Sequence, residues 1–180
     1  HRPVQTARLR ACADGVPGSP VIRWCTAVLL ACALAQPAWS LSCAPSDIAR
    51  DFHRAAKSDD SYIIVRGDLF FDETALPDRQ DQRQSRLRDK TDVEAWLTGH
   101  SLTKDGFTRR FERDVTLRVS CLGPWCGGTV KGPHLAFLRL EDRNWILQLS
   151  PCPGMAYVNP TLEQEEKALA CFRGERCVAE

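Results

Sequence analysis

The chain has 180 residues, nine of them cysteine, and a net charge of +1. A charge this close to zero argues against nucleic acid or an anionic membrane surface as the partner, because both attract strongly basic proteins. A chain of this length can bury a core, and cross-links between cysteines would add to its stability.

Residues 21–40 have the layout of a secretory signal peptide. Arg23 precedes an apolar run over residues 24–35, and the small residues Ala38 and Ser40 stand at the −3 and −1 positions of a cut before Leu41. The run is shorter than the about 20 residues that span a bilayer. We therefore expect an exported protein, periplasmic or secreted, that is not an integral membrane protein after cleavage.

Residues 1–20 show no apolar periodicity, and we predict that they are a non-native or upstream extension. Removing residues 1–40 leaves 20 basic and 22 acidic side chains, a net charge of −2. The remaining residues 41–180 have the length of a single domain.

The first half of this segment predicts a helix, a strand and a loop. Residues 45–57 predict a short helix with Ser46 or Asp47 as its N-cap and an apolar stripe that includes Ile48. Residues 62–71 give the strongest strand pattern, and Gly67 in its middle predicts a β-bulge or a sharp bend. The charged residues 72–92 predict a long exposed loop.

The second half predicts two hairpins and a helix. Residues 93–103 and 108–121 flank an Asp-Gly turn, and residues 134–140 and 145–149 form a further hairpin. Thr161 is predicted to cap a helix to residue 172, with Leu162, Ala168 and Leu169 inward. The predicted fold is mainly β with flanking helices. It is a five-stranded OB-like antiparallel barrel with a short N-terminal and a C-terminal helix.

Motifs spread over residues 43–171 resemble the netrin-like module, the OB-fold domain shared by tissue inhibitors of metalloproteinases. Cys43-Ala-Pro45 precedes a short helix and an apolar strand. Cys126-Gly127, a strand and a hairpin follow, then Cys152 and a helix that ends at Cys171. The resemblance implies a single netrin-like domain over residues 41–180, with the disulfides Cys43–Cys152, Cys121–Cys126 and Cys171–Cys177.

The start of the domain departs from the inhibitors, which begin with Cys-x-Cys and chelate the protease's zinc through the first cysteine. Leu41 stands in the place of that residue, and His53 stands where the family usually has another cysteine. These departures argue against metalloprotease inhibition. We therefore expect a protein-binding module, a protease-inhibitor-like domain that has lost the first chelating cysteine, with a protease disfavoured as its partner.

The predicted contact edge combines the N-terminal segment with the loop between Cys121 and Cys126, which the resemblance places side by side. Trp125 lies on this loop, and a tryptophan on so tight a loop is hard to bury. Exposed aromatic residues anchor interfaces. Most of the larger aromatic residues of the strands, Trp96 and Trp145 among them, are expected in the core, and the alternative is that they line a ligand-binding face of the barrel. The edge residues are Leu41, Ser42, Cys43, Ala44, Pro45 and Trp125.

No pattern in the sequence predicts catalysis, a metal or a cofactor. Four residues separate Cys121 from Cys126, and two glycines follow, whereas thioredoxin-like sites use Cys-x-x-Cys at a helix N-terminus. His53, His100 and His134 have no short-range ligand partner and are expected at or near the surface. The prediction is therefore a non-enzyme. Two alternatives stay open. One is a small exported enzyme or thiol–disulfide protein with an unrecognised site, and the other is a structural envelope component.

Overall fold

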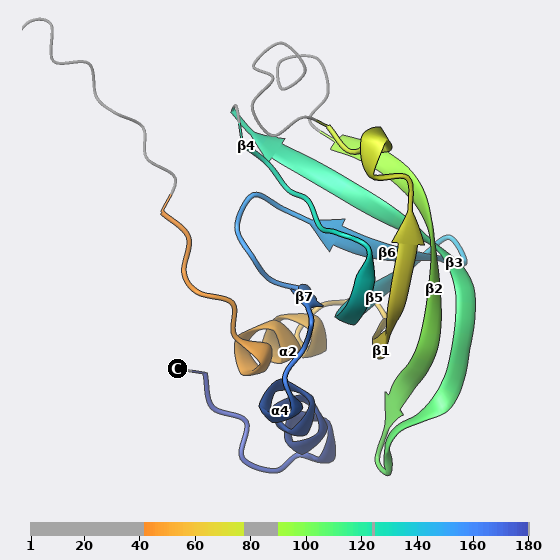
Figure 1. The fold of residues 1–180 in the computed structure, drawn as a ribbon. Coiled ribbons are helices and arrows are strands. Elements are labelled where there is room, and N and C mark those ends of the chain that lie inside the picture. The colour runs from red at the N-terminus through yellow and green to blue at the C-terminus, as the bar shows by residue number, and fades with distance from the viewer. Residues whose placement is uncertain (1–41, 78–89, 124, 180) are drawn as a thin grey trace, which may run out of the picture. The chain divides into compact units, whose positions relative to one another are not determined.

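Figure 1 shows the computed structural model of the protein, which describes residues 42–77, 90–123 and 125–179. The chain from Cys43 onward forms one unit by its internal contacts. The predicted extension and signal peptide, residues 1–40, lie outside the described residues, as does most of the predicted loop, residues 78–89. Among the described residues, no helix has the length and hydrophobicity to cross a bilayer.

The described chain is mainly β, with one helix near its start and one near its end (Figure 1). In chain order the elements are α2 (Ile48–Ala56), β1 (Tyr62–Phe71), the 3₁₀ helix η1 (Glu73–Ala75), β2 (Lys90–Thr103), β3 (Gly106–Leu122), β4 (Trp125–Cys126), β5 (Gly132–Glu141), β6 (Asn144–Leu149), β7 (Ala156–Val158) and α4 (Leu162–Arg173).

Five strands pair in a closed order, β1-β2-β3-β6-β5, because β1 also pairs with β5. The short strand β7 pairs with residues 134–136 of β5. The strand β4 pairs with the end of β3. The prediction of antiparallel strands throughout is wrong for β3 and β6, which run parallel. A parallel pair needs a long connection, and here β4 and β5 lie between the two strands along the chain.

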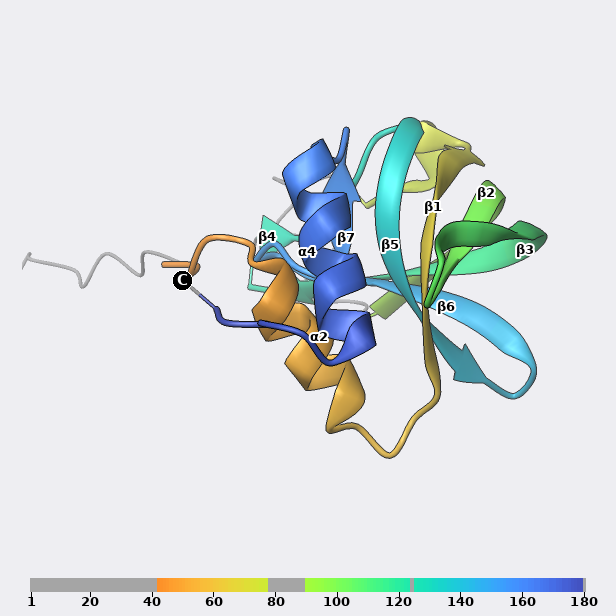
Figure 2. The same cartoon turned by 90° about the horizontal axis from the view of Figure 1, so that it is seen from below.

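Two clusters of buried apolar side chains hold this unit together. The first takes residues from β1, β2, β3, β5 and β6, such as Leu69, Leu97 and Leu117. The second joins the other face of β1 and β5 to the helices, for example through Ile48 of α2, Phe137 of β5 and Ala168 of α4. Figure 2 shows α2 and α4 next to each other beside β7 and β5.

Both helices begin at side chains that cap them. Asp47, one of the two predicted caps, accepts a hydrogen bond of 2.7 Å from the backbone N–H of Arg50. Thr161 and Gln164 form a reciprocal capping box on α4, which confirms Thr161. The prediction that Leu162 faces inward is wrong, because this side chain is 74% exposed. At about 100° per residue it lies opposite the buried Cys171.

The strand β1 keeps an unbroken register with β2 through Gly67, so the predicted bulge is not there. The shift in register lies in β2, between Ser101 and Leu102. Gly67 instead allows a close approach of two strands, because a Cβ at this position would lie 2.2 Å from the carbonyl oxygen of Thr98.

The predicted exposed loop over residues 72–92 is also shorter than expected. Residues 73–75 form η1, and β2 already begins at Lys90. The start of β2 pairs with the end of β3, and Asp92 accepts two hydrogen bonds of 2.9 Å from the guanidinium of Arg118. The charged residue Asp92 therefore lies in a strand, where Arg118 on the neighbouring strand β3 supplies its partner.

Candidate contact edge

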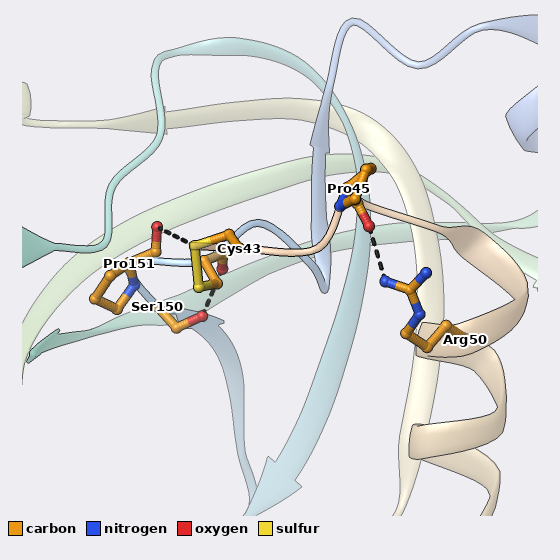
Figure 3. Close-up of a disulfide and its surroundings, with 6 residues drawn as sticks. Cys43, Pro45, Arg50, Ser150 and Pro151 are labelled. Carbon is orange, nitrogen blue, oxygen red and sulfur yellow. Dashed lines mark hydrogen bonds between the residues drawn. A yellow bond between two sulfur atoms is a disulfide. The ribbon is translucent and has the colours of Figure 1, made fainter. Parts of the chain in front are cut away.

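The N-terminal segment is fastened at two points (Figure 3). Cys43 forms a disulfide with Cys152, with 5.2 Å between the Cα atoms, and its Sγ lies 3.9 Å from the carbonyl oxygen of Pro151. The carbonyl of Pro45 accepts a hydrogen bond of 2.8 Å from the Arg50 guanidinium of α2. Between and beside these anchors, Ser42, Ala44 and Pro45 are exposed. Leu41 lies outside the described residues.

The strands β3 and β4 form a small hairpin that carries Trp125. Cys121 pairs with Cys126 across the hairpin and is joined to it by a disulfide. The next pair is Leu122 with Trp125, whose side chains share one face since they lie directly opposite each other. They are 59% and 39% exposed. The hairpin therefore presents two adjacent apolar side chains to solvent.

The N-terminal segment and the hairpin are both attached to the end of β6. Ser120 Oγ donates a hydrogen bond of 3.3 Å to the carbonyl of Leu149, and a Cβ on Gly127 would lie 2.4 Å from the same carbonyl oxygen. Leu149 leads through residues 150 and 151 into Cys152, which holds Cys43. Ser150 Oγ steadies this connection by donating a hydrogen bond of 2.7 Å to the carbonyl of Cys152.

The third disulfide, Cys171–Cys177, closes the end of α4. All three disulfides join the cysteines that the resemblance to the netrin-like module pairs. His53 of α2 also contacts this end of the chain. Its Nε2 lies 2.9 Å from the carbonyl oxygen of Cys177, and because a carbonyl only accepts, Nε2–H is the donor.

Leu122 is a candidate contact residue that the sequence prediction missed. It is more exposed than Trp125 and lies directly opposite it. The sequence contained a signal for Leu122. If Cys121 pairs with Cys126 across a short turn, the residues just inside them, Leu122 and Trp125, lie opposite each other. Trp125 is exposed as predicted. Trp96 is an exception to the expectation that most strand aromatic residues lie in the core, since its side chain is 41% exposed.

The expectation that the histidines lie at or near the surface is wrong for His134, which is fully buried. His134 Nδ1 lies 2.8 Å from the carbonyl oxygen of Gly132, so Nδ1–H donates, and Nε2 then accepts a bond of 2.6 Å from the Thr129 hydroxyl. Burial lowers the pKa of His134. The neutral imidazole of His134 thus has both of its nitrogens in hydrogen bonds within the protein, which indicates a structural role.

Asp51 is a second buried polar group of this kind. Its Oδ2 accepts hydrogen bonds from the backbone N–H of Met155 at 3.0 Å and from the Tyr157 hydroxyl at 2.5 Å. Burial, with the hydrogen bond to Asp51, raises the pKa of Tyr157 well above its ordinary value. The carboxylate thus fixes α2 to the segment after Cys152.

Within the part of the chain that the structure describes, no three His, Cys, Asp or Glu side chains are grouped so as to hold a metal ion. Comparisons with models of protein families, with curated proteins and with solved structures found no match to the chain.

Proposed function

We propose that the protein is an exported, non-enzymatic module that binds a protein partner, built on a netrin-like OB barrel. The observation that carries the proposal is the exposed pair Leu122 and Trp125 on a disulfide-closed hairpin. Large apolar side chains held out on a rigid support are typical anchors of protein interfaces. The partner is a protein of unknown process.

The strand pairing supports the barrel architecture. OB folds are five-stranded Greek-key barrels, and the five paired strands here include one strand, β1, with partners on both edges and one parallel pair, β3 with β6. The three disulfides support export to the periplasm or beyond the cell, because disulfides persist in oxidising compartments.

The proposed contact edge consists of Ser42, Cys43, Ala44, Pro45, Leu122 and Trp125, with Leu41 before it. Its support is that the N-terminal segment and the hairpin share one anchor at the end of β6. A surface fixed by two disulfides loses little conformational entropy when a partner binds.

The test uses the exported protein, tagged at its C-terminus, to capture a partner from its native envelope or secreted fraction, with identification by mass spectrometry. We expect a partner in defined stoichiometry. Trp125→Ala and Leu122→Ser should weaken its binding by about 1–3 kcal/mol each. Trp96→Ala is the matched control, because Trp96 is exposed to nearly the same extent.

Equal capture by the wild type and Trp125→Ala would refute the edge. Two reactive free thiols in the native exported protein would refute the disulfide-stabilised module and favour a thiol–disulfide protein. A zinc protease as the captured partner would point to the amino terminus at Leu41 as part of the contact.

A further inference from the structure

A groove runs between α2, the start of β1 and the end of β2. It encloses about 690 Å³, a volume in the range of small-molecule sites. Its apolar lining consists mainly of Phe52, Ile63, Ile64, Leu102 and Phe172. Several of these belong to the second buried cluster, so the groove exposes one side of that core to solvent.

A second groove of about 520 Å³ adjoins the first and shares Ile63, Ser101 and Arg109 with it. This second groove is basic, with Arg113 and Arg143 among its lining residues. One of its walls is aromatic, because the rings of Phe111 and Trp145 meet edge to face at 6.2 Å. The two grooves thus form one trough that is apolar at one end and cationic at the other.

The cationic end carries more positive charge than the neighbouring acids neutralise. Four cationic side chains and one acidic side chain, Asp114, line the second groove, and Lys104 and Asp60 line the first. Asp60 is engaged by Arg139, and Arg110 is engaged by Glu112. Among the residues that the structure describes, Arg109, Arg113 and Arg143 make no ion pair.

We infer that this trough binds a free, single-chain anionic amphiphile. The apolar chain lies along the groove beside α2, and the anionic head group accepts charge-assisted hydrogen bonds from Arg109 and Arg113. Charge complementarity selects the anion, and the concave apolar lining selects the chain. An extended peptide fits less well, because its backbone N–H and C=O groups need partners that an apolar lining does not supply.

The first experiment is isothermal titration of the exported protein with dodecanoate below its micelle concentration. Dodecanol supplies the same chain without a charge, and butyrate supplies the charge without the chain. We expect saturable binding of one dodecanoate, with dodecanol and butyrate at least about tenfold weaker. Equal affinity for dodecanol, or no saturable binding of dodecanoate, would overturn the inference.

Variants then separate the two ends of the trough. Arg109→Gln combined with Arg113→Gln removes two head-group donors, and Ala56→Glu introduces an acid into the lining of the apolar groove. Each change should weaken dodecanoate binding at least about tenfold. Arg176→Gln and Ala75→Glu are matched controls at exposed positions outside both grooves, and they should leave the affinity unchanged.

Two further arms distinguish other ligands. Vesicles of phosphatidylglycerol or an acidic peptide that bind while dodecanoate does not would overturn the inference. Unchanged affinity in folded variants, checked by their urea unfolding midpoints, would also overturn it. Trp125→Ala should bind dodecanoate like the wild type, so this result is independent of the proposed protein-binding edge.

Discussion

Asp51 Oδ2 accepts a hydrogen bond of 2.5 Å from the hydroxyl of Tyr157, which lies 106 residues later in the chain. The same oxygen accepts from the backbone N–H of Met155, whose φ of 62° falls in the left-handed region that side-chain-bearing residues rarely adopt. A Cβ on Gly154 would approach both carboxylate oxygens to 3.1 Å. One carboxylate therefore holds a strained turn in place against α2.

Removing this carboxylate should destabilise the fold strongly. Asp51→Ala leaves two buried donors without an acceptor, so we expect a loss of about 3–5 kcal/mol in the free energy of unfolding. Tyr157→Phe removes one donor and should cost about 1.5–3 kcal/mol. Urea denaturation measures both. Asp59→Ala, at an exposed position, should change stability by less than about 0.5 kcal/mol. Similar losses at Asp51 and Asp59 would contradict this account.

Alkaline pH should destabilise the protein through Tyr157. Burial raises the pKa of this phenol in the folded chain, while the unfolded chain ionises near pH 10. The stabilising contribution is therefore complete below about pH 10 and is lost as the pH rises above it. The difference in tyrosinate absorbance between wild type and Tyr157→Phe should appear only where the protein unfolds. A Tyr157 signal in folded protein near pH 10 would disprove the shift.

Mild acid should destabilise the protein through His134. Burial lowers the pKa of this imidazole, so the unfolded chain takes up a proton near pH 6.5 while the folded chain does not. Its contribution is complete above about pH 6.5 and declines as the pH falls below that value. We expect His134→Gln to lose less stability than wild type between pH 7.5 and pH 5, measured by urea denaturation. Equal losses of stability in the wild type and in His134→Gln would indicate that other titrating groups dominate the pH dependence.

The three disulfides should differ in their contributions. Cys43–Cys152 closes a sequence separation of 109 residues, whereas Cys121–Cys126 and Cys171–Cys177 close 5 and 6. In the chain-entropy treatment the long loop is worth about 4–5 kcal/mol and each short loop about 2 kcal/mol. Pairwise Cys→Ser replacement followed by thermal unfolding tests this order. A larger loss from either short loop would show that local geometry outweighs loop length.

Gly67 should not tolerate a methyl group. The Cβ of Gly67→Ala would lie 2.2 Å from the carbonyl oxygen of Thr98 and 2.9 Å from the Cα of Gly99, both of them backbone atoms. We expect a loss of about 3 kcal/mol or more in urea denaturation. Gly106→Ala is the control, because its φ is +104° but nothing lies within 4 Å of the added atom. It should cost about 1 kcal/mol. Equal losses would mean that close approach is not the cause.

Local signals in the sequence were sufficient for several elements. Asp47 and Thr161 precede apolar periodic segments and cap the two helices, because N-caps depend on residues only a few positions away. The Asp-Gly turn between residues 103 and 106 lies in the predicted hairpin. The exposure of Trp125 followed from the short spacing of the two cysteines around it.

Features that depend on distant partners were not predictable in this way. The parallel pairing of β3 with β6 and the ion pair of Asp92 with Arg118 are set by the way the strands close on each other. His134 lies in β5, where residues 134–138 are all buried. A strand buried on both faces does not show the alternation of polar and apolar residues from which a half-buried strand is predicted.

The burial of β5 on both faces also determines how the protein opens. Ala136 and Leu138 belong to the first cluster, whereas Leu135 and Phe137 belong to the second. Neither cluster can separate without disturbing the strand that the other needs, so the two cores melt together. We therefore expect the amide hydrogens of residues 134–138 to exchange with solvent only through global unfolding, and those at the tip of the β2–β3 hairpin to exchange through local opening.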